Sequence, residues 1–263
     1  MALVDYQSAD GIATLTLTFA PANCYTHEMM CELDAAILKA RFDDSAHVIV
    51  ITGAGEKFFC AGADINMLKT VTPRFKYFFC LHANETLNRL EQTPKLVIAA
   101  IQGNCVGGGL EIAMAADLRI ARKGGGKVGL PEVTLGVLPG TGGTQRLVRI
   151  VGKSAAIEMM TSGRLFEHDE ALQRGIVNFV YDAPDRASFL AKVTEYAKSF
   201  CPPNKASKAV GLIKRAVQSG AEVDFHDALA IERELQQQLF QSEDAKEGLG
   251  AYVEKRKPNF KGQ

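Results

Sequence analysis

Two short apolar runs constrain the fold of this chain more than any other feature. They are HVIVIT at 47–52 and LVIAAI at 96–101, and a glycine follows each within two residues. Runs that are apolar at nearly every position, rather than at alternate positions, are typical of strands buried on both faces. Such strands occur mainly in parallel sheets whose two faces are covered by helices.

The segments between and around these runs fit the same architecture. Apolar residues recur at helical spacing in 27–40 and 74–90, and 110–116 also reads as a helix. Further strands are expected where apolar residues alternate or cluster, at 12–19, 118–121 and 177–181. Strands that alternate with helices in this way predict an α/β fold with mostly parallel strands.

The last third of the chain has a different pattern. Beyond residue 181 the strand signal fades, and a Cys-Pro-Pro sequence at 201–203 marks a boundary. We therefore predict a core over 1–200 and an all-helical region over 201–263. Apolar faces on these helices must be buried, either on the core or on another subunit. The expected helices are 188–199, 205–218, 223–241 and 243–255.

Composition excludes several classes of function. Lys plus Arg and Asp plus Glu both number 30, and a balanced charge argues against a nucleic-acid-binding protein. The chain shows no signal peptide and no apolar stretch near the roughly 20 residues that span a bilayer, so we expect no membrane partner and a cytoplasmic location. The six cysteines form no CxxC pair and there is no HExxH sequence, so we expect reduced thiols and no metal site.

Glycines gather around two glutamates between residues 103 and 147. Glu111 follows a triple glycine, and Glu132 follows Pro131 shortly before another glycine cluster at 140–143. Glycine lets a ligand approach backbone N–H groups closely, and a helix that begins at such a turn adds a positive dipole end. The pattern predicts an anion-stabilising site beside an acid and a base.

Simpler interpretations compete with this prediction. The triple glycine alone also fits a tight strand-to-helix turn with no ligand, and a phosphate loop is disfavoured because the P-loop lysine is missing. Each glutamate alone fits a stabilising acid in the first turn of a helix. Asp64, in CAGAD at 60–64, fits a helix N-cap. Only the combination favours a catalytic site.

Long segments of the sequence resemble the crotonase (enoyl-CoA hydratase/isomerase) superfamily, and most closely its hydratases. The loop FFCAGADI and the ending AYVEKRKPNFKGQ resemble family signatures, and PANCYT at 21–26 departs from the family at Cys24 and Tyr25. The other matching segments are GGGLEIAMAADLRIA at 107–121, GLPEVTLGVLPGTGGTQRL at 129–147 and VGKSAAIEMMTSG at 151–163.

The resemblance implies a fold and an assembly. The family fold is a spiral of ββα turns followed by C-terminal helices that form trimers, and trimers commonly pair into hexamers. We therefore expect a crotonase-like α/β spiral core and a homotrimer or hexamer. The loop KGGGK at 123–127 is unusual, because it places the two glutamates one residue further apart than in a typical hydratase.

The resemblance also implies roles for single residues. Glu111 and Glu132 match the two carboxylates that hold and activate water, and the N–H groups of Ala63 and Gly108 match the oxyanion hole. Gly140 matches a backbone donor that places the water. Coenzyme A would be bound by residues at matching positions, namely Lys57, Ala61, Ala63, Asp64, Ile65 and Lys255.

The implied reaction is addition of water to a 2-enoyl-CoA, with coenzyme A as part of the substrate and no separate cofactor. An isomerase that shifts the double bond is the nearest alternative, followed by other acyl-CoA enolate chemistry. Because isomerases generally need one proton-shuttling carboxylate, two glutamates favour hydration. An RNA-binding relative is disfavoured, since Lys205, Lys208 and Lys214 are dispersed. Tyr25, His82 and the 74–82 helix are candidates for shaping the acyl pocket.

Overall fold

A six-stranded sheet forms the centre of the molecule, for which a computed structural model describes residues 2–263. All pairings are parallel except that of the first two strands, which confirms the prediction of mostly parallel strands. The order is β1 (Val4–Ala9), β2 (Ile12–Leu17), β3 (Val48–Gly53), β5 (Leu96–Ile101), β7 (Leu118–Arg122) and β10 (Phe179–Tyr181).

A second sheet of very short strands lies beyond the first. The chain repeatedly passes from a strand of the large sheet to a strand of the small one and then to a helix, so each passage is one ββα turn of a spiral. The sequence alone did not reveal these strands, because two or three residues are too few to show an alternating pattern. They are β4 (Phe58–Cys60), β6 (Asn104–Val106), β8 (Lys127–Gly129) and β9 (Phe166–Glu167).

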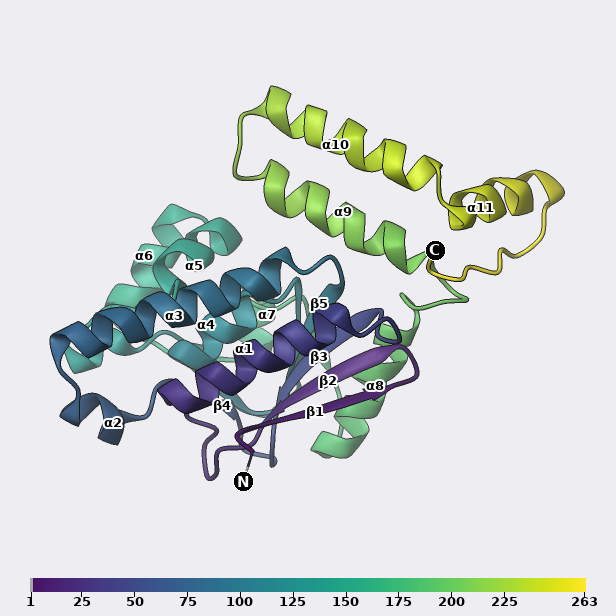
Figure 1. The fold of residues 1–263 in the computed structure, drawn as a ribbon. Coiled ribbons are helices and arrows are strands. Elements are labelled where there is room, and N and C mark those ends of the chain that lie inside the picture. Colours follow the sequence, from purple (N-terminus) through teal and green to yellow (C-terminus); the bar gives the residue numbers. More distant parts are fainter. Residues whose placement is uncertain (1) are drawn as a thin grey trace.

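Helices cover both faces of the large sheet (Figure 1). On one face, α1 (His27–Phe42) and α3 (Pro73–Gln92) bury Leu33, Ile37 and Leu87 against strand residues of the main core. On the other face, α8 (Arg186–Lys198) buries Phe189 and Val193 against a second apolar cluster. This double burial explains why β3 and β5 are apolar throughout.

The C-terminal helices extend away from the sheet (Figure 1). α9 (Ser207–Gly220) is anchored to the core because the buried ammonium of Lys214 pairs with Asp117, with 2.9 Å between Nζ and Oδ2. In contrast, α10 (Phe225–Phe240) has no buried residue, and α11 (Glu243–Glu254) buries only Asp244 and Ala251. These helices lie within two or three residues of their predicted bounds.

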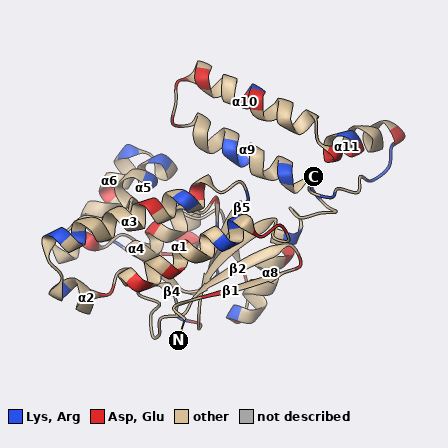
Figure 2. Cartoon of the chain, in the orientation of Figure 1, with Lys and Arg blue, Asp and Glu red and all other residues tan. Residues whose placement is uncertain are grey.

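Six further helical segments complete the described part of the chain, residues 2–263. None of the helices in residues 2–263 combines the length and apolar character needed to cross a membrane. Positive and negative side chains are mixed along α1, α3, α10 and α11, whereas α9 carries only positive ones (Figure 2). The remaining elements are α2 (Ile65–Thr70), α4 (Gly108–Met114), η1 (Glu132–Leu135), α5 (Gly143–Val151), α6 (Lys153–Ser162) and α7 (His168–Gln173).

Candidate active site

Glu111 is held by backbone N–H groups inside the core. It lies in α4, a helix buried over its whole length, and is only 1% exposed. Its Oε1 accepts hydrogen bonds from the N–H groups of Thr141 and Gly143, both at 2.7 Å. Gly143 is the first residue of α5, so the carboxylate also lies at the positive end of that helix. Burial raises the pKa of Glu111, and the two N–H groups oppose that shift by favouring the ionised form.

Glu132 has a less complete set of partners. It is the first residue of η1 and is half-buried, and its Oε2 is buried with no hydrogen-bond partner among residues 2–263. Burial, with a smaller contribution from the charge of Glu111, raises the pKa of Glu132 to about 7. The two carboxyl groups therefore have different environments: two N–H donors favour the ionised form of Glu111, whereas burial dominates at Glu132 and favours its protonated form.

Both glutamates line one cavity of about 420 Å³. The N–H of Gly107 donates to the carbonyl of Gly129 at 2.9 Å. This bond joins the start of α4, which carries Glu111, to the end of β8, three residues before Glu132. A Cβ atom on Gly107 would lie only 3.0 Å from Oε1 of Glu132, so this position needs glycine. The long KGGGK loop forms the turn between β7 and β8 and leaves Glu132 in the cavity.

Two backbone N–H groups lie at the edge of the same cavity. Ala63 and Gly108 both line it, and neither N–H donates a hydrogen bond to any atom of residues 2–263. A Cβ atom on Gly62 would lie 3.2 Å from the nitrogen of Gly108, so the loop before α2 runs against the first turn of α4. Two free donors that meet at a cavity can bind one carbonyl oxygen and stabilise negative charge on it.

Comparison with known proteins gives this geometry a family. The family described as "Enoyl-CoA hydratase/isomerase" matches residues 7–263. The chain belongs to this family. It is 37% identical over 253 residues to a probable enoyl-CoA hydratase of Bacillus subtilis, covering 96% of both chains. It is 37% identical over 247 residues to the short-chain-enoyl-CoA hydratase of Clostridium acetobutylicum, covering 94% of this chain and 92% of the relative.

A solved structure confirms the spiral fold that the resemblance implied. The crystal structure of an enoyl-CoA hydratase from Geobacillus kaustophilus superimposes with a TM-score of 0.96 at 46% identity. The match covers all of this chain and 98% of the other. The present chain therefore has the crotonase fold. Its ββα turns form the spiral, and its C-terminal helices follow it.

Most of the site residues predicted from the sequence come together at the cavity. Besides the two glutamates and the two N–H groups, the lining includes Gly140, Ala61 and Ile65. Asp64 acts as the N-cap of α2, with its Oδ1 accepting from the N–H of Met67 at 2.8 Å, and is not part of the lining. This is the simpler role that the sequence had left open.

The two predicted coenzyme A lysines lie apart from the cavity. Lys57 is exposed in the turn between β3 and β4, and Lys255 is exposed at the end of α11. Neither contributes to the cavity lining. Figure 1 shows α11 at the opposite end of the molecule from α2. Lys255, at the end of α11, is therefore remote from the cavity of its own chain.

Tyr25 forms a wall of the cavity and was foreseen only as a candidate. Its hydroxyl is 2.9 Å from the hydroxyl of Thr141, the residue whose N–H binds Glu111. A Cβ atom on Gly108 would lie 2.3 Å from the Tyr25 ring, so the glycine permits the phenol to pack beside the free N–H. Of the other candidates, the 74–82 helix contributes Lys76 to the lining, whereas His82 is not among the lining residues.

The rest of the wall is mostly apolar and suits a hydrocarbon chain. It comes from α2, from the segment before α3 and from the residues after Glu132, with Lys76 as a positively charged member. The apolar residues of this wall are Leu68, Val71, Leu135, Val137 and Leu138. They were hard to foresee from the sequence, because they lie in short helices and loops and several are exposed.

Proposed function

We propose that the chain is an enoyl-CoA hydratase that adds water across the 2,3 double bond of a 2-enoyl-CoA and releases 3-hydroxyacyl-CoA. The observation that carries the proposal is the pair of glutamates with different environments, which face one cavity beside two free N–H groups. Membership of the hydratase/isomerase family and relatives named as hydratases support it.

Each group has a role in this reaction. The N–H groups of Ala63 and Gly108 bind the thioester oxygen and stabilise the enolate-like charge that develops there; one such donor typically contributes about 10²–10³-fold in rate. Ionised Glu111 orients the water and takes its proton as the oxygen bonds to C3. Protonated Glu132 gives its proton to C2. C3 thus gains the hydroxyl group and C2 gains a hydrogen. The proton taken up by Glu111 then returns to Glu132 through solvent, which restores both carboxyl groups. Gly140 helps to place the water, and no cofactor takes part.

Double-bond isomerisation is the nearest alternative. It moves one proton between two carbons and needs one carboxyl group to carry it. The buried Glu111, held by two N–H groups while Glu132 remains available as an acid, fits two simultaneous tasks better than one. RNA binding is less supported, because one of its candidate lysines, Lys214, is buried in an ion pair with Asp117.

The proposal includes coenzyme A binding and self-association. The backbone of residues 61–65 would hold the adenine end, with Lys57 and a neighbouring subunit's copy of Lys255 near the phosphates. Large apolar side chains on the C-terminal helices are more than half exposed, which favours burial in a homotrimer or hexamer. They are Ile213, Val217, Phe225, Phe240, Leu249, Tyr252 and Val253.

The decisive test is the loss of enoyl-thioester ultraviolet absorbance when the purified chain is mixed with crotonyl-CoA. Light scattering on the same sample gives the subunit number. The short-chain name of the Clostridium relative makes crotonyl-CoA the first substrate, followed by longer and cyclic 2-enoyl-CoAs. Absorbance loss with formation of 3-hydroxyacyl-CoA supports hydration. Binding of CoA esters without hydration of any of them, together with conversion of a 3-enoyl-CoA to its 2-isomer, would replace the proposal with isomerisation.

A further inference from the structure

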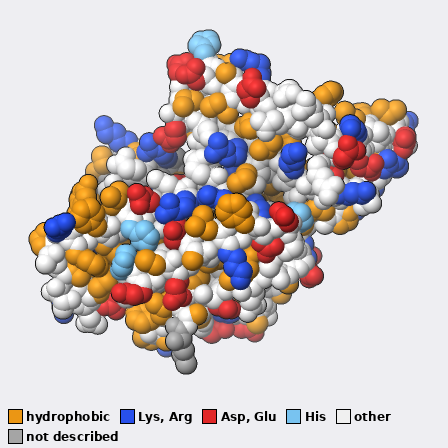
Figure 3. Space-filling model, viewed as in Figure 1, with side chains coloured by type: hydrophobic (Ala, Val, Ile, Leu, Met, Phe, Trp, Pro, Cys, Tyr) orange, Lys and Arg blue, Asp and Glu red, His pale blue; other side chains and the backbone are white. Residues whose placement is uncertain are grey.

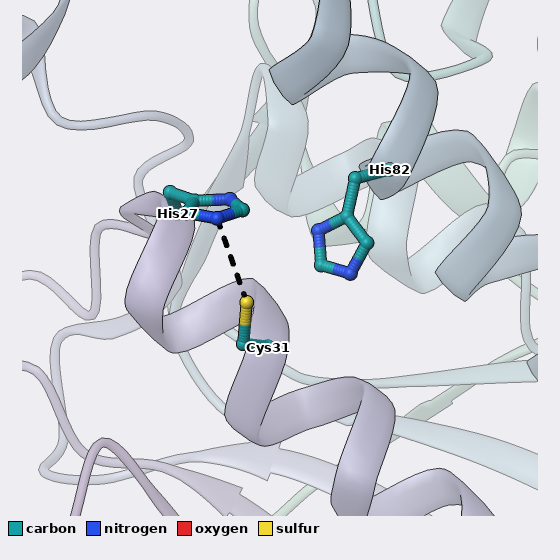
Figure 4. A group of neighbouring side chains, drawn as sticks. All are labelled: His27, Cys31 and His82. Atoms are coloured by element: carbon teal, nitrogen blue, oxygen red, sulfur yellow. Dashed lines mark hydrogen bonds between the residues drawn. The ribbon is translucent and has the colours of Figure 1, made fainter.

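A cluster of three side chains outside the cavity has the composition of a metal site. His27 is the first residue of α1, Cys31 lies one helical turn later, and His82 comes from α3. Residues four apart lie on the same face of a helix, so His27 and Cys31 project in one direction. Figure 4 shows His82 reaching from α3 toward that pair. The cluster therefore joins two helices that pack side by side on the sheet.

The spacing of the donor atoms is close to that of a tetrahedral site. The Sγ of Cys31 is 3.7 Å from Nε2 of His27, and one potential ligand atom from each residue lies within 4.8 Å of the other two. Zinc–sulfur and zinc–nitrogen bonds of about 2.3 and 2.05 Å at a tetrahedral angle place the two ligand atoms about 3.6 Å apart. The pair on α1 already has this separation, and His82 completes the set by a shift of about 1 Å.

An unpartnered nitrogen gives a second indication of a missing ligand. Nδ1 of His82 is buried and has no hydrogen-bond partner among residues 2–263. Figure 4 shows the His82 nitrogen next to Cγ, which is Nδ1, on the side that faces His27 and Cys31. Because buried polar atoms are almost always paired, an unpaired nitrogen that points at two other donors indicates a bound group.

The surroundings favour a cation and allow it to enter. Cys31 is exposed and the two histidines are half-buried, and histidine side chains are visible at the surface over α1 and α3 (Figure 3). The carboxylates of Glu28 and Asp34 act on Cys31 through space, so the local field is negative. Two imidazoles and one thiolate are ligands that zinc prefers.

We propose that His27, Cys31 and His82 bind one Zn²⁺, with a water molecule as fourth ligand, and that the ion ties α1 to α3. Binding forms a zinc–sulfur bond and releases the thiol proton of Cys31 to solvent. The sequence had indicated no metal site because only two of the ligands are close in the chain. In the sequence, the only indication of this site is the spacing of four residues between His27 and Cys31.

The zinc site lies behind the wall of the enoyl-CoA cavity. The His27 ring packs edge-on against Phe79, with ring centroids 6.5 Å apart, and Phe79 stacks on Tyr25 at 5.5 Å. None of the three ligands lines the cavity itself. The ion therefore has a structural role, and its loading is measurable without reference to hydration.

The test uses the full chain after treatment with a chelator and dialysis. Zn²⁺ is titrated against a chromophoric chelator, and Co²⁺ is then added as a spectroscopic substitute. We expect one equivalent of metal, a tetrahedral cobalt spectrum with a thiolate-to-cobalt band, and a higher melting temperature with zinc. Cys31→Ser should abolish the thiolate band. His82→Gln should weaken zinc binding by more than about tenfold, since even changes around the ligands have effects of that size.

Cys24→Ser is the matched control, because it removes another partly accessible thiol outside the cluster and should leave the cobalt spectrum unchanged. Circular dichroism of each variant verifies folding. Absence of a thiolate-to-cobalt band in the parent chain would overturn the proposal. So would zinc affinity that is unchanged in both Cys31→Ser and His82→Gln, which would identify binding at scattered surface groups. Stable binding of copper but not zinc would overturn the choice of metal.

Discussion

The segments that carry the two glutamates differ in how completely the fold surrounds them. Glu111 lies in a helix that is buried throughout, and two N–H groups bind its carboxylate. Glu132 begins a four-residue 3-10 helix in which no residue is fully buried, and one of its oxygens has no partner. The same residue type thus has donors that favour its ionised form in one region and lacks a comparable set in the other.

This difference shows that burial alone does not set the state of a carboxyl group. Glu111 is the more buried of the two, yet it is the one supplied with donors that stabilise negative charge. Glu132 is less buried, but burial, with a smaller contribution from the charge of Glu111, raises its pKa to about 7 because fewer donors oppose the shift. The four predictions below test this division, from the largest expected effect to the smallest.

Replacing either glutamate should have the largest effect. Glu111→Gln and Glu132→Gln keep the shape of the side chain but remove the carboxyl group that accepts or donates a proton, so each should lower kcat for crotonyl-CoA by about 10²–10⁴-fold. Steady-state kinetics measures the loss, and calorimetric titration with a saturated acyl-CoA should show nearly unchanged binding. Full activity in either variant would remove that glutamate from the mechanism.

Crowding the carboxylate of Glu111 should have the next largest effect. A Cβ atom on Gly143 would lie 2.9 Å from Oε1 of Glu111 and 2.7 Å from Cβ of Pro139, so Gly143→Ala must displace the carboxylate or the turn. We expect kcat to fall by up to about 10²-fold, as for other small misplacements of catalytic groups. Gly250→Ala in α11 is the control, because nothing lies within 4 Å of its Cβ position. Equal activities of the two variants would show that the geometry of Glu111 is not critical.

The pH profile tests the protonation of Glu132. With a pKa of about 7, the group is protonated below that pH and loses its proton above it. Because the proposed mechanism needs the protonated acid, kcat/KM for crotonyl-CoA should fall above pH 7, approaching tenfold per pH unit. Initial rates between pH 6 and 9 measure this limb, and the residual activity of Glu132→Gln should lack it. A parent profile that stays flat to pH 9 would assign the acid role elsewhere.

The smallest effect concerns stability. The pKa of Glu132 rises from an ordinary 4.5 to about 7 on folding, so the folded state binds more protons between these values and stability falls as pH rises through them. Above pH 7 the cost is roughly 1–3 kcal/mol, reduced by the partial exposure of the side chain. Denaturant unfolding should therefore show Glu132→Gln gaining stability over the parent at pH 8, and the gain should vanish near pH 4. An equal difference at both pH values would contradict the raised pKa.

The sequence predicted the long elements well, for physical reasons, and it singled out the two glutamates that line the cavity. The buried strands β3 and β5 and the helices α1 and α3 are long enough for their apolar pattern to be legible, and their bounds agree within two residues. Glu111, Gly108 and Ala63 were reached through glycine-rich motifs and through resemblance to the family. The small sheet was missed because its strands are two or three residues long and gain their stability from tertiary pairing.

The sequence by itself determined the α/β class, the helical C-terminal region and the two glutamates, because these depend on patterns within short stretches of chain. Only the tertiary structure decided the different environments of the two glutamates, the packing of Tyr25 against Gly108 and the meeting of His82 with His27 and Cys31. These properties depend on burial and on donors that are distant in the chain. Glu111, for example, receives its two hydrogen bonds from residues 30 and 32 positions later.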